Sequence, residues 1–572
     1  MASNSERKNR FPRPLSGPAT KDFGPYADGS GRQSAGLAWS RAWLTFRVHL
    51  DAFALDPSTY LKALAWRLRG LKVRSRNSIA PLLGRSPRAY ALWIRRNETD
   101  RAGEGQWPGA AGAHIIPVID CREGSDGLAA TMASLSGAGA QPIILGGPAT
   151  AATVRIQHPR ELARYAGTSG IWLCPLRPGD GLSPRAFATY AAIAATAASA
   201  LVYADDDLQS PEGRSAPHFK PEWNADLFRH HDYLTGASIV LAAKDTLAAL
   251  PDTGWAEALV ASAVASGGAP VHVPQVLHHR VERPAPKPPA KPASPMPGPL
   301  PLVSVILPTR NQLTLLRTCV DGLKRCDYPS VEIIIIDNGS DDPATLDYLS
   351  ALQGSGLAVL HMPGAFNFSK LNNAAVGRAT GDLLCFLNND VEMVDDDWLS
   401  LLVRQAVRSE IGAVGARLLY PDHTIQHAGV FTGIGGGAGH GHRFQREEED
   451  GYFQRARLPQ QVSAVTAACL VVARDKFLAV GGFDETDFPV AFNDVDLCLK
   501  LNASGWQSFY EPRAMLIHHE SKSRGSDSAR SNRVRFAGEL AALKRKWRTD
   551  EKVDPYHHPH LSRFSEQFLI AV

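Results

Sequence analysis

Residues 303–387 alternate short apolar runs with stretches in which apolar residues recur at helical spacing. Short apolar runs bounded by turn residues are typical of buried strands. We therefore expect strands at 303–307, 331–336, 357–362 and 383–387, separated by helices at 313–324, 344–353 and 371–378. Strands joined through helices form a mostly parallel sheet with helices on both faces, so this part of the chain is predicted to have an α/β fold.

Polar residues end three of these predicted strands. Pro308 and Thr309 follow the first, Asp337 follows the second, and Asp390 follows the last. In open α/β sheets, ligands bind outside the carboxyl ends of the strands, so these residues are candidates for one binding site. Asp337 could also be a helix N-cap, because the next three residues are typical of turns.

A Pro-rich segment, residues 281–301, separates this unit from an earlier one of similar pattern. Such a segment favours extended structure and acts as a semi-rigid spacer. Residues 170–181 align without a gap on residues 381–392, and the alignment places Gly179 opposite Asp390 and Gly181 opposite Glu392. We therefore predict two α/β domains in tandem, of which the first has lost its acidic residues. The predicted parts are a disordered basic tail (1–36), a helical region (37–105), a first domain (106–280), the linker (281–301), a second domain (302–525) and a C-terminal helical extension (526–572).

The acidic residues near the strand ends suggest two kinds of chemistry. Asp390 and Glu392 point the same way if the chain is extended, and paired carboxylates suit Mn²⁺ or Mg²⁺. A solvated turn is the alternative. Asp494 begins an apolar helical run and could be a general base or only a helix cap. His518 ends a further strand and could complete a metal shell or lie on the surface.

Charge is distributed unevenly along the 572 residues. Residues 1–110 hold 19 Lys and Arg against 8 Asp and Glu, although the whole chain has a net charge of only +4. The basic helical region could contact an anionic membrane surface or form a solvated helical hairpin. No motif supports nucleic-acid binding. The seven scattered cysteines favour reduced thiols, and residues 187–204 favour an Ala-rich buried helix leading into a strand over a membrane span. We expect a cytoplasmic protein, with a peripheral contact to the inner face of the membrane as an open alternative.

Several short motifs in fixed order resemble a known family. These are PTRN (308–311), DNGS (337–340), FNFSKLNNAA (366–375), LNNDVE (387–392), VGGFDE (480–485), FNDVDLCLK (492–500) and IHHESKSRG (517–525). Together they resemble the inverting family 2 glycosyltransferases with a GT-A nucleotide-sugar fold, particularly bacterial enzymes of O-antigen, capsule or exopolysaccharide assembly. The first domain also resembles a companion domain of two-domain members, through YALWIRRNE (90–98), LVYADDDLQ (201–209), FKPEWNADLF (219–228) and HVPQVLHHR (272–280).

The resemblance implies a role for each matching residue. The nucleotide sugar would be bound by Pro308, Thr309, Asn311, Asp337, Asn389 and Asp390. Asp390, Glu392 and His518 would hold a divalent metal, Mn²⁺ or Mg²⁺. Asp494 would be the catalytic base, with Asp496 as the alternative. Glu392 stands where the family usually has a second Asp, and Asn493 where many relatives have Glu, which leaves open which acid is the base.

The implied function is a metal-dependent hexosyl or deoxyhexosyl transfer. The donor would be a nucleotide-diphosphate sugar and the acceptor a hydroxyl of a glycan or lipid-linked saccharide in cell-surface polysaccharide biosynthesis. Two alternatives stay open, a polymerising enzyme that uses both domains and an inactive glycan- or nucleotide-binding partner. The first domain is expected to be a scaffold or acceptor-binding module. The Gly-rich stretch 433–442 lacks the Lys of a P-loop and is expected to be a flexible loop on the acceptor side.

Overall fold

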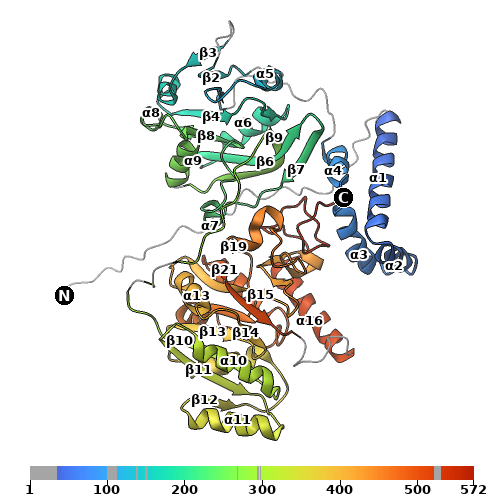
Figure 1. Cartoon of the computed structure of the whole chain (residues 1–572), viewed down its shortest axis with the longest axis vertical. Coiled ribbons are helices and arrows are strands. Elements are labelled where there is room, and N and C mark those ends of the chain that lie inside the picture. The colour runs from blue at the N-terminus through green and yellow to red at the C-terminus, as the bar shows by residue number, and fades with distance from the viewer. Residues whose placement is uncertain are drawn as a thin grey trace, which may run out of the picture.

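The computed structural model describes residues 35–98, 113–136, 140–147, 153–266, 268–292, 296, 298–520 and 530–572. The two sheets lie one beyond the other along the long axis of the molecule, and a group of N-terminal helices lies beside them (Figure 1). The N-terminal helices are α1 (Ala35–Leu55), α2 (Pro57–Leu68), α3 (Lys72–Gly84) and α4 (Ala89–Asn97). The basic region is therefore helical, as its sequence pattern predicts.

The first sheet is built from residues 115–280. Its strands are β1 (Ile115–Asp120), β2 (Ile143–Leu145), β3 (Val154–Ile156), β4 (Ile171–Leu176), β5 (Gly181–Leu182), β6 (Leu201–Ser210), β7 (Gly213–His218), β8 (Ser238–Ala242) and β9 (Val271–Arg280). The helices between them are α5 (Leu128–Ser136), η1 (Pro159–Tyr165), α6 (Ala186–Ala194), α7 (Ala225–Phe228), α8 (Lys244–Ala248) and α9 (Trp255–Ala265). The uncharged stretch 187–204 is thus the helix α6 followed by the start of β6. Within the described residues, no helix is both long and apolar enough to cross a bilayer.

The second sheet is built from residues 303–518. Its main strands are β10 (Val303–Thr309), β11 (Val331–Asp337), β12 (Ala358–His361), β13 (Leu383–Leu387), β14 (Val391–Met393), β15 (Ile411–Leu419), β16 (Ile425–His427), β19 (Gln460–Val462), β20 (Cys469–Ala473) and β21 (Gln507–His518). Its helices are α10 (Leu313–Arg325), α11 (Pro343–Gly354), α12 (Phe368–Val376), α13 (Trp398–Ala406), α14 (Arg474–Ala479) and α15 (Asn493–Ala503). The four strands and three helices predicted for 303–387 are all present.

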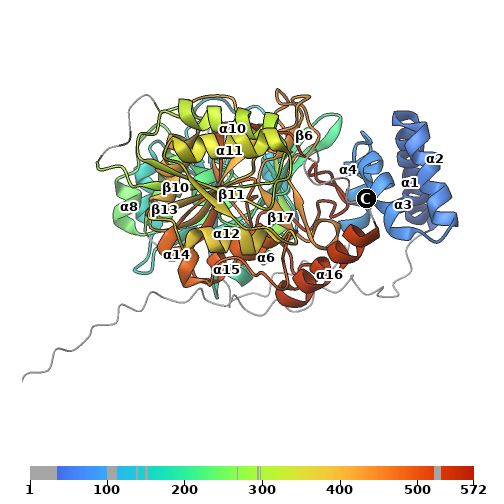
Figure 2. The same ribbon diagram turned by 90° about the horizontal axis from the view of Figure 1, so that it is seen from below.

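Alternating strand residues of the second sheet enter two separate cores. Val303, Val305 and Leu307 pack on one face with residues of α10, α11 and α13, whereas Ile306 and Ile336 pack on the other face with residues of α12 and α15. Figure 2 shows the same arrangement, with α10 and α11 above the sheet and α12, α14 and α15 below it. Burial on both faces explains why these strands read as continuous apolar runs.

The two sheets share the same topology along a path of eight strands. The strand order is β3-β2-β1-β4-β8-β6-β9-β5 in the first and β12-β11-β10-β13-β20-β15-β21-β14 in the second, with β7 and β16 added to β6 and β15, and β19 added to β21 in the second sheet. In each sheet the first four strands are parallel, and the fifth strand, β8 or β20, is antiparallel to both of its neighbours. The prediction of an α/β fold with two such domains in tandem is confirmed.

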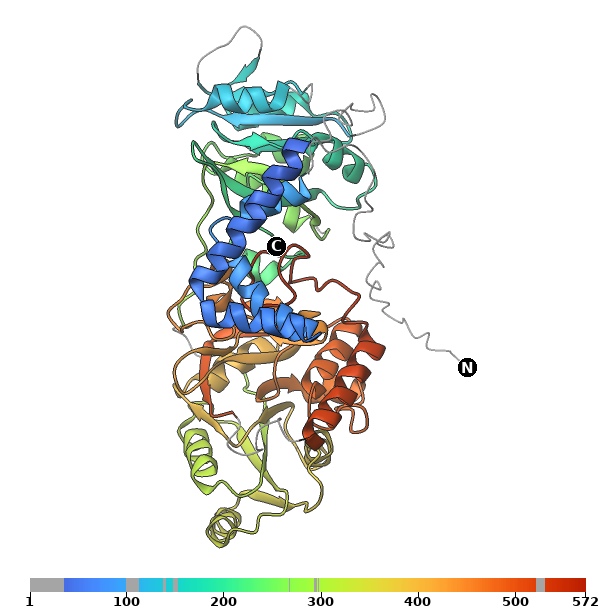
Figure 3. The ribbon, with the colours of Figure 1, turned by 90° about the vertical axis from the view of Figure 1, so that its right-hand side faces the viewer.

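The C-terminal segment joins the two domains. The helix α16 (Arg530–Trp547) ends early, and residues 548–572 contain turns and an isolated bridge instead of the predicted helical extension. Within this segment the Pro555 carbonyl accepts a hydrogen bond from the Glu222 amide of the first domain, and the Tyr556 carbonyl accepts one from Arg455 of the second. Figure 3 shows the C-terminus beside the N-terminal helices, between the two sheets. Burial between the domains, rather than helical propensity, fixes this segment.

The Gly-rich stretch is packed closely against its neighbours, so the expectation of a flexible loop is wrong. Within this stretch, η2 (Ile434–Gly436) connects two strands that pair with each other, β17 (Val430–Thr432) just before it and β18 (Ala438–His440) after it. A Cβ atom at Gly437 would lie 2.5 Å from a methyl group of Leu540. Glycine is needed there for close packing and not for mobility.

Candidate active site

Three strand ends of the second sheet meet as the sequence predicts. Thr309 on β10 and Asp337 on β11 are direct partners in the parallel ladder, and both are buried. The Asn389 side-chain amide, just after β13, donates a hydrogen bond of 2.9 Å to the Thr309 hydroxyl. The Asp337 carboxylate accepts a hydrogen bond from the Ser340 amide and contacts His361. Thr309, Asp337 and Asn389 therefore form one continuous polar edge.

Asn311 connects the loop after β10 to the loop after β11 through hydrogen bonds. Its side-chain oxygen accepts hydrogen bonds from the Asp341 and Asp342 amides, and its own amide donates to the Ser340 hydroxyl. Asn311 has a positive φ of 55°, a conformation that Asn tolerates better than most residues. Pro308 lies within β10, immediately before Thr309.

Asp390 and His518 come from distant parts of the sequence and meet at the same edge. His518 Nε2 lies 3.0 Å from Asp390 Oδ1, and both side chains are nearly buried. The pairing of β14 with β21 brings them together, because Val391 and His518 are ladder partners. The His519 amide also donates a hydrogen bond to the Asp390 carbonyl.

Gln426 fixes a proton on one nitrogen of His518 and leaves the other facing Asp390. The Gln426 amide nitrogen donates to Glu520 at 3.0 Å, which leaves its oxygen, 2.8 Å from His518 Nδ1, as an acceptor. His518 Nδ1 then carries a proton, and Nε2 faces the Asp390 carboxylate, as a donor in the protonated ring and with a lone pair in the neutral ring. The amide nitrogen of Asn388 lies 3.3 Å from the same Nε2, consistent with an acceptor there. Nε2 and the Asp390 oxygen, 3.0 Å apart, form an ion pair when the ring is protonated, and both could ligate a cation when the ring is neutral.

Glu392 points toward the same edge but contacts a different histidine. Its carboxylate lies 2.9 Å from His519 Nε2 and is about two-fifths exposed. Glu392 is therefore adjacent to the Asp390–His518 pair without touching it. The carboxylate oxygens of Glu392 and Asp390 suit Mn²⁺ or Mg²⁺.

Asp494 lies at the second position of α15, close to the loop that precedes β20. Its carboxylate accepts a hydrogen bond of 3.0 Å from the Ala467 amide. The neighbouring Ala468 carbonyl accepts a hydrogen bond from the Asn388 amide, so this loop links Asp494 to the end of β13. Burial raises the pKa of Asp494, although hydrogen bonds from Ala467 and Thr466 oppose the shift. A half-buried carboxylate with a raised pKa is suited to accept a proton.

Asp496 faces another part of the molecule. Its side chain is fully buried, lies 2.8 Å from Lys546 and 3.3 Å from Lys500, and accepts a hydrogen bond of 2.8 Å from the Trp547 indole. Lys546 and Trp547 belong to α16. Asp496 thus attaches the C-terminal helix to the second domain.

In the described part of the first domain, other residue types occupy the equivalent positions. The ladder registers place Gly146 at the position of Asp337 and Arg280 at that of His518. The helices α9 and α15 have equal lengths, and Ala256 corresponds to Asp494. Gly179 and Gly181 stand opposite Asp390 and Glu392 in the sequence alignment, so five candidate site positions carry a different residue type in the first domain.

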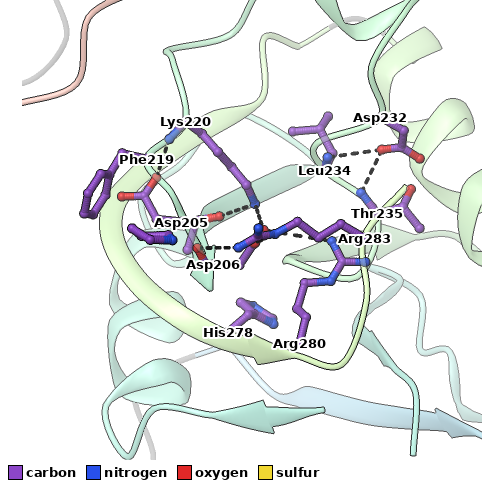
Figure 4. A network of polar contacts seen from close by, with 12 residues as sticks. Asp205, Asp206, Phe219, Lys220, Asp232, Leu234, Thr235, His278, Arg280 and Arg283 are labelled. Carbon is purple, nitrogen blue, oxygen red and sulfur yellow. Dashed lines mark hydrogen bonds and ion pairs between the residues drawn. The ribbon is translucent and has the colours of Figure 1, made fainter. Parts of the chain in front are cut away.

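Buried ion pairs occupy the same edge of the first sheet. Asp206 contacts Lys220 at 2.7 Å and also contacts Arg283, and all three side chains are buried or nearly so (Figure 4). Arg280, at the position of His518, lies 3.9 Å from Asp206. Asp207 accepts hydrogen bonds from Tyr90 and Arg214. These contacts engage the carboxylates of Asp206 and Asp207 in a structural network.

One group of three side chains among the described residues is close enough to share a metal ion: Asp205, His272 and His558. His558 Nδ1 accepts a hydrogen bond from the His560 amide, so the proton lies on Nε2, 2.8 Å from Asp205. Burial alone would lower the pKa of His272, but Asp205 and Glu222 outweigh it and raise the pKa to about 9. A carboxylate between two protonated nitrogens is already neutralised. We interpret this group as an ion-paired connection between the first domain and the C-terminal segment.

Sequence reasoning missed two features of the site. Gln426 is separated by 92 residues from His518, and only the pairing of β16 with β15, next to β21, brings it close. The QH pair at 426–427 offers no spacing signal that identifies this role. The Glu392–His519 contact was also unforeseen, because the sequence does not distinguish the two adjacent histidines.

Comparisons with known proteins agree with these observations. A family model described as "Glycosyl transferase family 2" matches residues 304–477. The chain is 37% identical over 419 residues to the uncharacterized protein y4gI of Sinorhizobium fredii, covering 65% of this chain and 46% of that protein. It is 35% identical over 445 residues to the O-antigen biosynthesis protein RfbC of Myxococcus xanthus, covering 70% of this chain and 34% of that protein. The chain spans less than half the length of either relative.

A solved mannosyltransferase, PcManGT from Pyrobaculum calidifontis in complex with GDP-Man and Mn²⁺, is also similar. It is 19% identical, with 47% of this chain and 71% of that chain covered, at a TM-score of 0.34. A likeness of this extent supports no statement about the chemistry of this chain.

Proposed function

Residues 304–477 form a glycosyl transferase family 2 domain, and on this premise we propose that the chain is an inverting, metal-dependent glycosyltransferase. Its donor is a nucleotide-diphosphate sugar, and its acceptor is a hydroxyl of a glycan or lipid-linked saccharide in cell-surface polysaccharide biosynthesis. The observation that carries the proposal is the meeting of Asp390 and His518 beside the polar edge formed by Thr309, Asp337 and Asn389.

Asp390 and His518 are proposed to hold a divalent cation, with Glu392 able to join them by side-chain rotation. Such a cation supplies positive charge that stabilises the leaving diphosphate. Gln426 keeps His518 in the tautomer that presents Nε2 to the site. The nucleoside of the donor would be bound on the same edge by Thr309, Asp337 and Asn389. Pro308 and Asn311 would shape the end of β10 and the loop after it.

Asp494 is the proposed general base. In a single displacement, the acceptor oxygen forms a bond to the anomeric carbon while the bond from that carbon to the diphosphate oxygen breaks. The hydroxyl proton passes to the Asp494 carboxylate, and attack opposite the leaving group inverts the anomeric centre. The raised pKa of Asp494 favours proton uptake at this step. Asp496 is excluded from this role because its oxygens are already bound to Lys546, Lys500 and Trp547.

The first domain is proposed to be a scaffold. The replacement of five site positions and the closed ion pairs around Asp206 favour this role over a second transferase, and they disfavour a polymerising enzyme that uses both domains.

The helices α1–α3 are proposed to contact an anionic membrane surface. Trp43, Phe46, Leu50 and Phe53 recur at helical spacing along α1, and Trp43 is 59% and Phe46 52% exposed. Residues 35–84 contain eight Lys and Arg but only two Asp, at positions 51 and 56. Exposed apolar stripes with an excess of basic residues fit the interface of an anionic membrane. Such a contact would place the enzyme at the inner face of the cytoplasmic membrane, where a lipid-linked acceptor resides.

Calorimetry with a panel of nucleotide sugars, with and without Mn²⁺, tests the donor site. Wild-type protein should bind one donor in a Mn²⁺-dependent manner, Asp390→Ala should lose this dependence, and Asp494→Asn should still bind but not transfer. Turnover by the Asp390→Ala, Asp494→Asn double variant would mean that the first domain is active. Donor binding without transfer to any acceptor by wild-type protein would favour the inactive partner instead.

A further inference from the structure

The edge of the first sheet carries the opposite charge to the candidate metal site of the second. The ladder registers place Arg280, the last residue of β9, at the position that His518 has in the second sheet. In open α/β sheets, ligands bind outside the carboxyl ends of the strands, so a ligand of the first domain would lie here. A guanidinium group attracts anions, whereas the carboxylates and imidazole of the second domain are suited to a cation.

The Arg280 guanidinium is buried, and its hydrogen-bond donors are unused. Arg280 is 5% exposed, its Nε is fully buried without a partner, and the side chain forms no hydrogen bond with the described residues. The one carboxylate that pairs with it in the described part of the chain, Asp206, lies 3.9 Å from Nη1. That carboxylate already binds Lys220 at 2.7 Å and also Arg283. A buried charge without a close partner is costly, so a ligand that completes it would bind favourably.

A second unused donor belongs to the loop against which this guanidinium lies. A Cβ atom at Gly236 would lie 2.7 Å from Arg280 Nη2, and Gly236 has a φ of 77°, so glycine lets the guanidinium approach the loop backbone. The hydroxyl of Thr235, the preceding residue, is buried and has no hydrogen-bond partner. Figure 4 shows Thr235 beside the guanidinium end of Arg280. Two kinds of hydrogen-bond donor therefore meet here without an acceptor.

Positive charge exceeds negative charge around Arg280. The cations are Arg280, Lys220 and Arg283, and the carboxylates that face them are Asp206 and Asp180. Asp180 is buried, accepts hydrogen bonds from two backbone amides, and has a pKa that burial raises. Three cations against two carboxylates leave one positive charge uncompensated. A buried water molecule could accept hydrogen bonds from the free donors, but only an anion would also balance this charge.

We propose that Arg280 and Thr235 bind a chloride ion at the position equivalent to the candidate metal site of the second domain. The side chains around it are nearly buried, which restricts the ligand to a small inorganic anion. The bound anion would stabilise the first domain by completing the charge of its sheet edge. The first domain would thus keep a ligand site at this edge with the sign of the ligand reversed. This site is separate from the proposed transferase site of the second domain.

Thermal unfolding of the full-length protein in sodium chloride and in sodium gluconate, at equal ionic strength, tests the proposal. Wild type should melt at least about 2 °C higher in chloride, because gluconate is too large for the site. Arg280→Met removes the guanidinium and should abolish this difference. Arg160→Met, which replaces an exposed arginine of the first domain, is the matched control and should keep it. Equal melting of wild type in both salts, or the same difference in Arg280→Met, would overturn the assignment.

A second measurement locates the ion directly and does not depend on the folding of any variant. Bromide replaces chloride in crystals of wild-type protein, and its anomalous scattering identifies bound ions. We expect an anomalous peak between the Arg280 guanidinium and the Thr235 hydroxyl. Bromide peaks elsewhere on the protein with none at this position would mean that water fills the site, which would overturn the proposal.

Discussion

The side-chain oxygen of Gln426 lies 2.8 Å from His518 Nδ1, and this contact determines which nitrogen of His518 faces Asp390. The orientation of the Gln426 amide is fixed in turn by its hydrogen bond to Glu520. Groups that orient a metal ligand affect metal affinity without touching the ion. Gln426 is thus a positioning residue for the proposed metal site.

Gln426→Leu should weaken Mn²⁺ binding by about 10- to 100-fold, because His518 loses the acceptor that selects its tautomer. Titration calorimetry with Mn²⁺ alone measures this directly, without any need for turnover. Gln426→Glu keeps an acceptor at the same place and should retain more of the affinity than Gln426→Leu. Unchanged Mn²⁺ affinity in Gln426→Leu, with an unchanged melting temperature, would argue against the role.

Asp494→Asn and Asp496→Asn should have different effects. Asp494→Asn is expected to reduce transfer by about 10²–10⁴-fold while donor binding persists, because only the proton acceptor is lost. Asp496→Asn should lower the melting temperature, because Lys546 and Trp547 lose the group that attaches α16. Rates and thermal unfolding measured on both variants distinguish the roles, and a reversal of the two outcomes would identify Asp496 as the base.

Stability should fall as the pH rises from about 6.5 to about 9. The Asp205 carboxylate holds the His272 pKa at about 9, above the unfolded value of 6.5. His272 therefore stabilises the folded state fully below pH 6.5, and this contribution is lost as pH rises through 9. A tenfold difference in proton affinity between the folded and unfolded states corresponds to about 1.4 kcal/mol of stability. The free energy of unfolding is measured for wild type and His272→Gln across this pH window. It should fall with rising pH only in wild type, and an equal fall in both proteins would contradict the assignment.

Lys220→Met should reduce the free energy of unfolding by about 3–5 kcal/mol, because it leaves the Asp206 carboxylate buried with one partner fewer. Lys244→Met, which changes an exposed lysine of the same domain, is the control and should be close to neutral. Denaturant unfolding followed by circular dichroism gives both values. A loss below about 1 kcal/mol would mean that the network in Figure 4 is not a stabilising element.

Replacement of the exposed aromatic residues of α1 should reduce membrane binding. The double variant Trp43→Ser, Phe46→Ser should bind vesicles that contain phosphatidylglycerol at least fivefold more weakly, as measured by sedimentation. Wild type should bind neutral phosphatidylcholine vesicles poorly. Leu346→Ser, at an exposed apolar position of α11, is the matched control. If the double variant Trp43→Ser, Phe46→Ser instead changes the oligomeric state in gel filtration without altering vesicle binding, the exposed aromatic face of α1 is a protein interface.

Parts of the fold and of the site could be predicted from the sequence with good accuracy. The apolar runs at 303–307, 331–336 and 383–387 are strands within a residue or two, because residues buried on both faces of a sheet must all be apolar. The meeting of Thr309, Asp337 and the polar residues after β13 was also predictable, since the carboxyl ends of parallel strands meet at one edge. The C-terminal extension was predicted wrongly beyond Trp547, because its conformation depends on burial between two domains.

The sequence by itself determined the strands, their mostly parallel arrangement and the loss of acidic residues from the first domain, because these depend on local periodicity and on residue type. Tertiary structure alone decided which of His518 and His519 faces Asp390, that Gln426 orients His518, and that Asp496 attaches α16 instead of lying in the site. Each of these pairings joins residues at least 50 positions apart, and their geometry depends on strand register and helix packing, which local pattern does not encode.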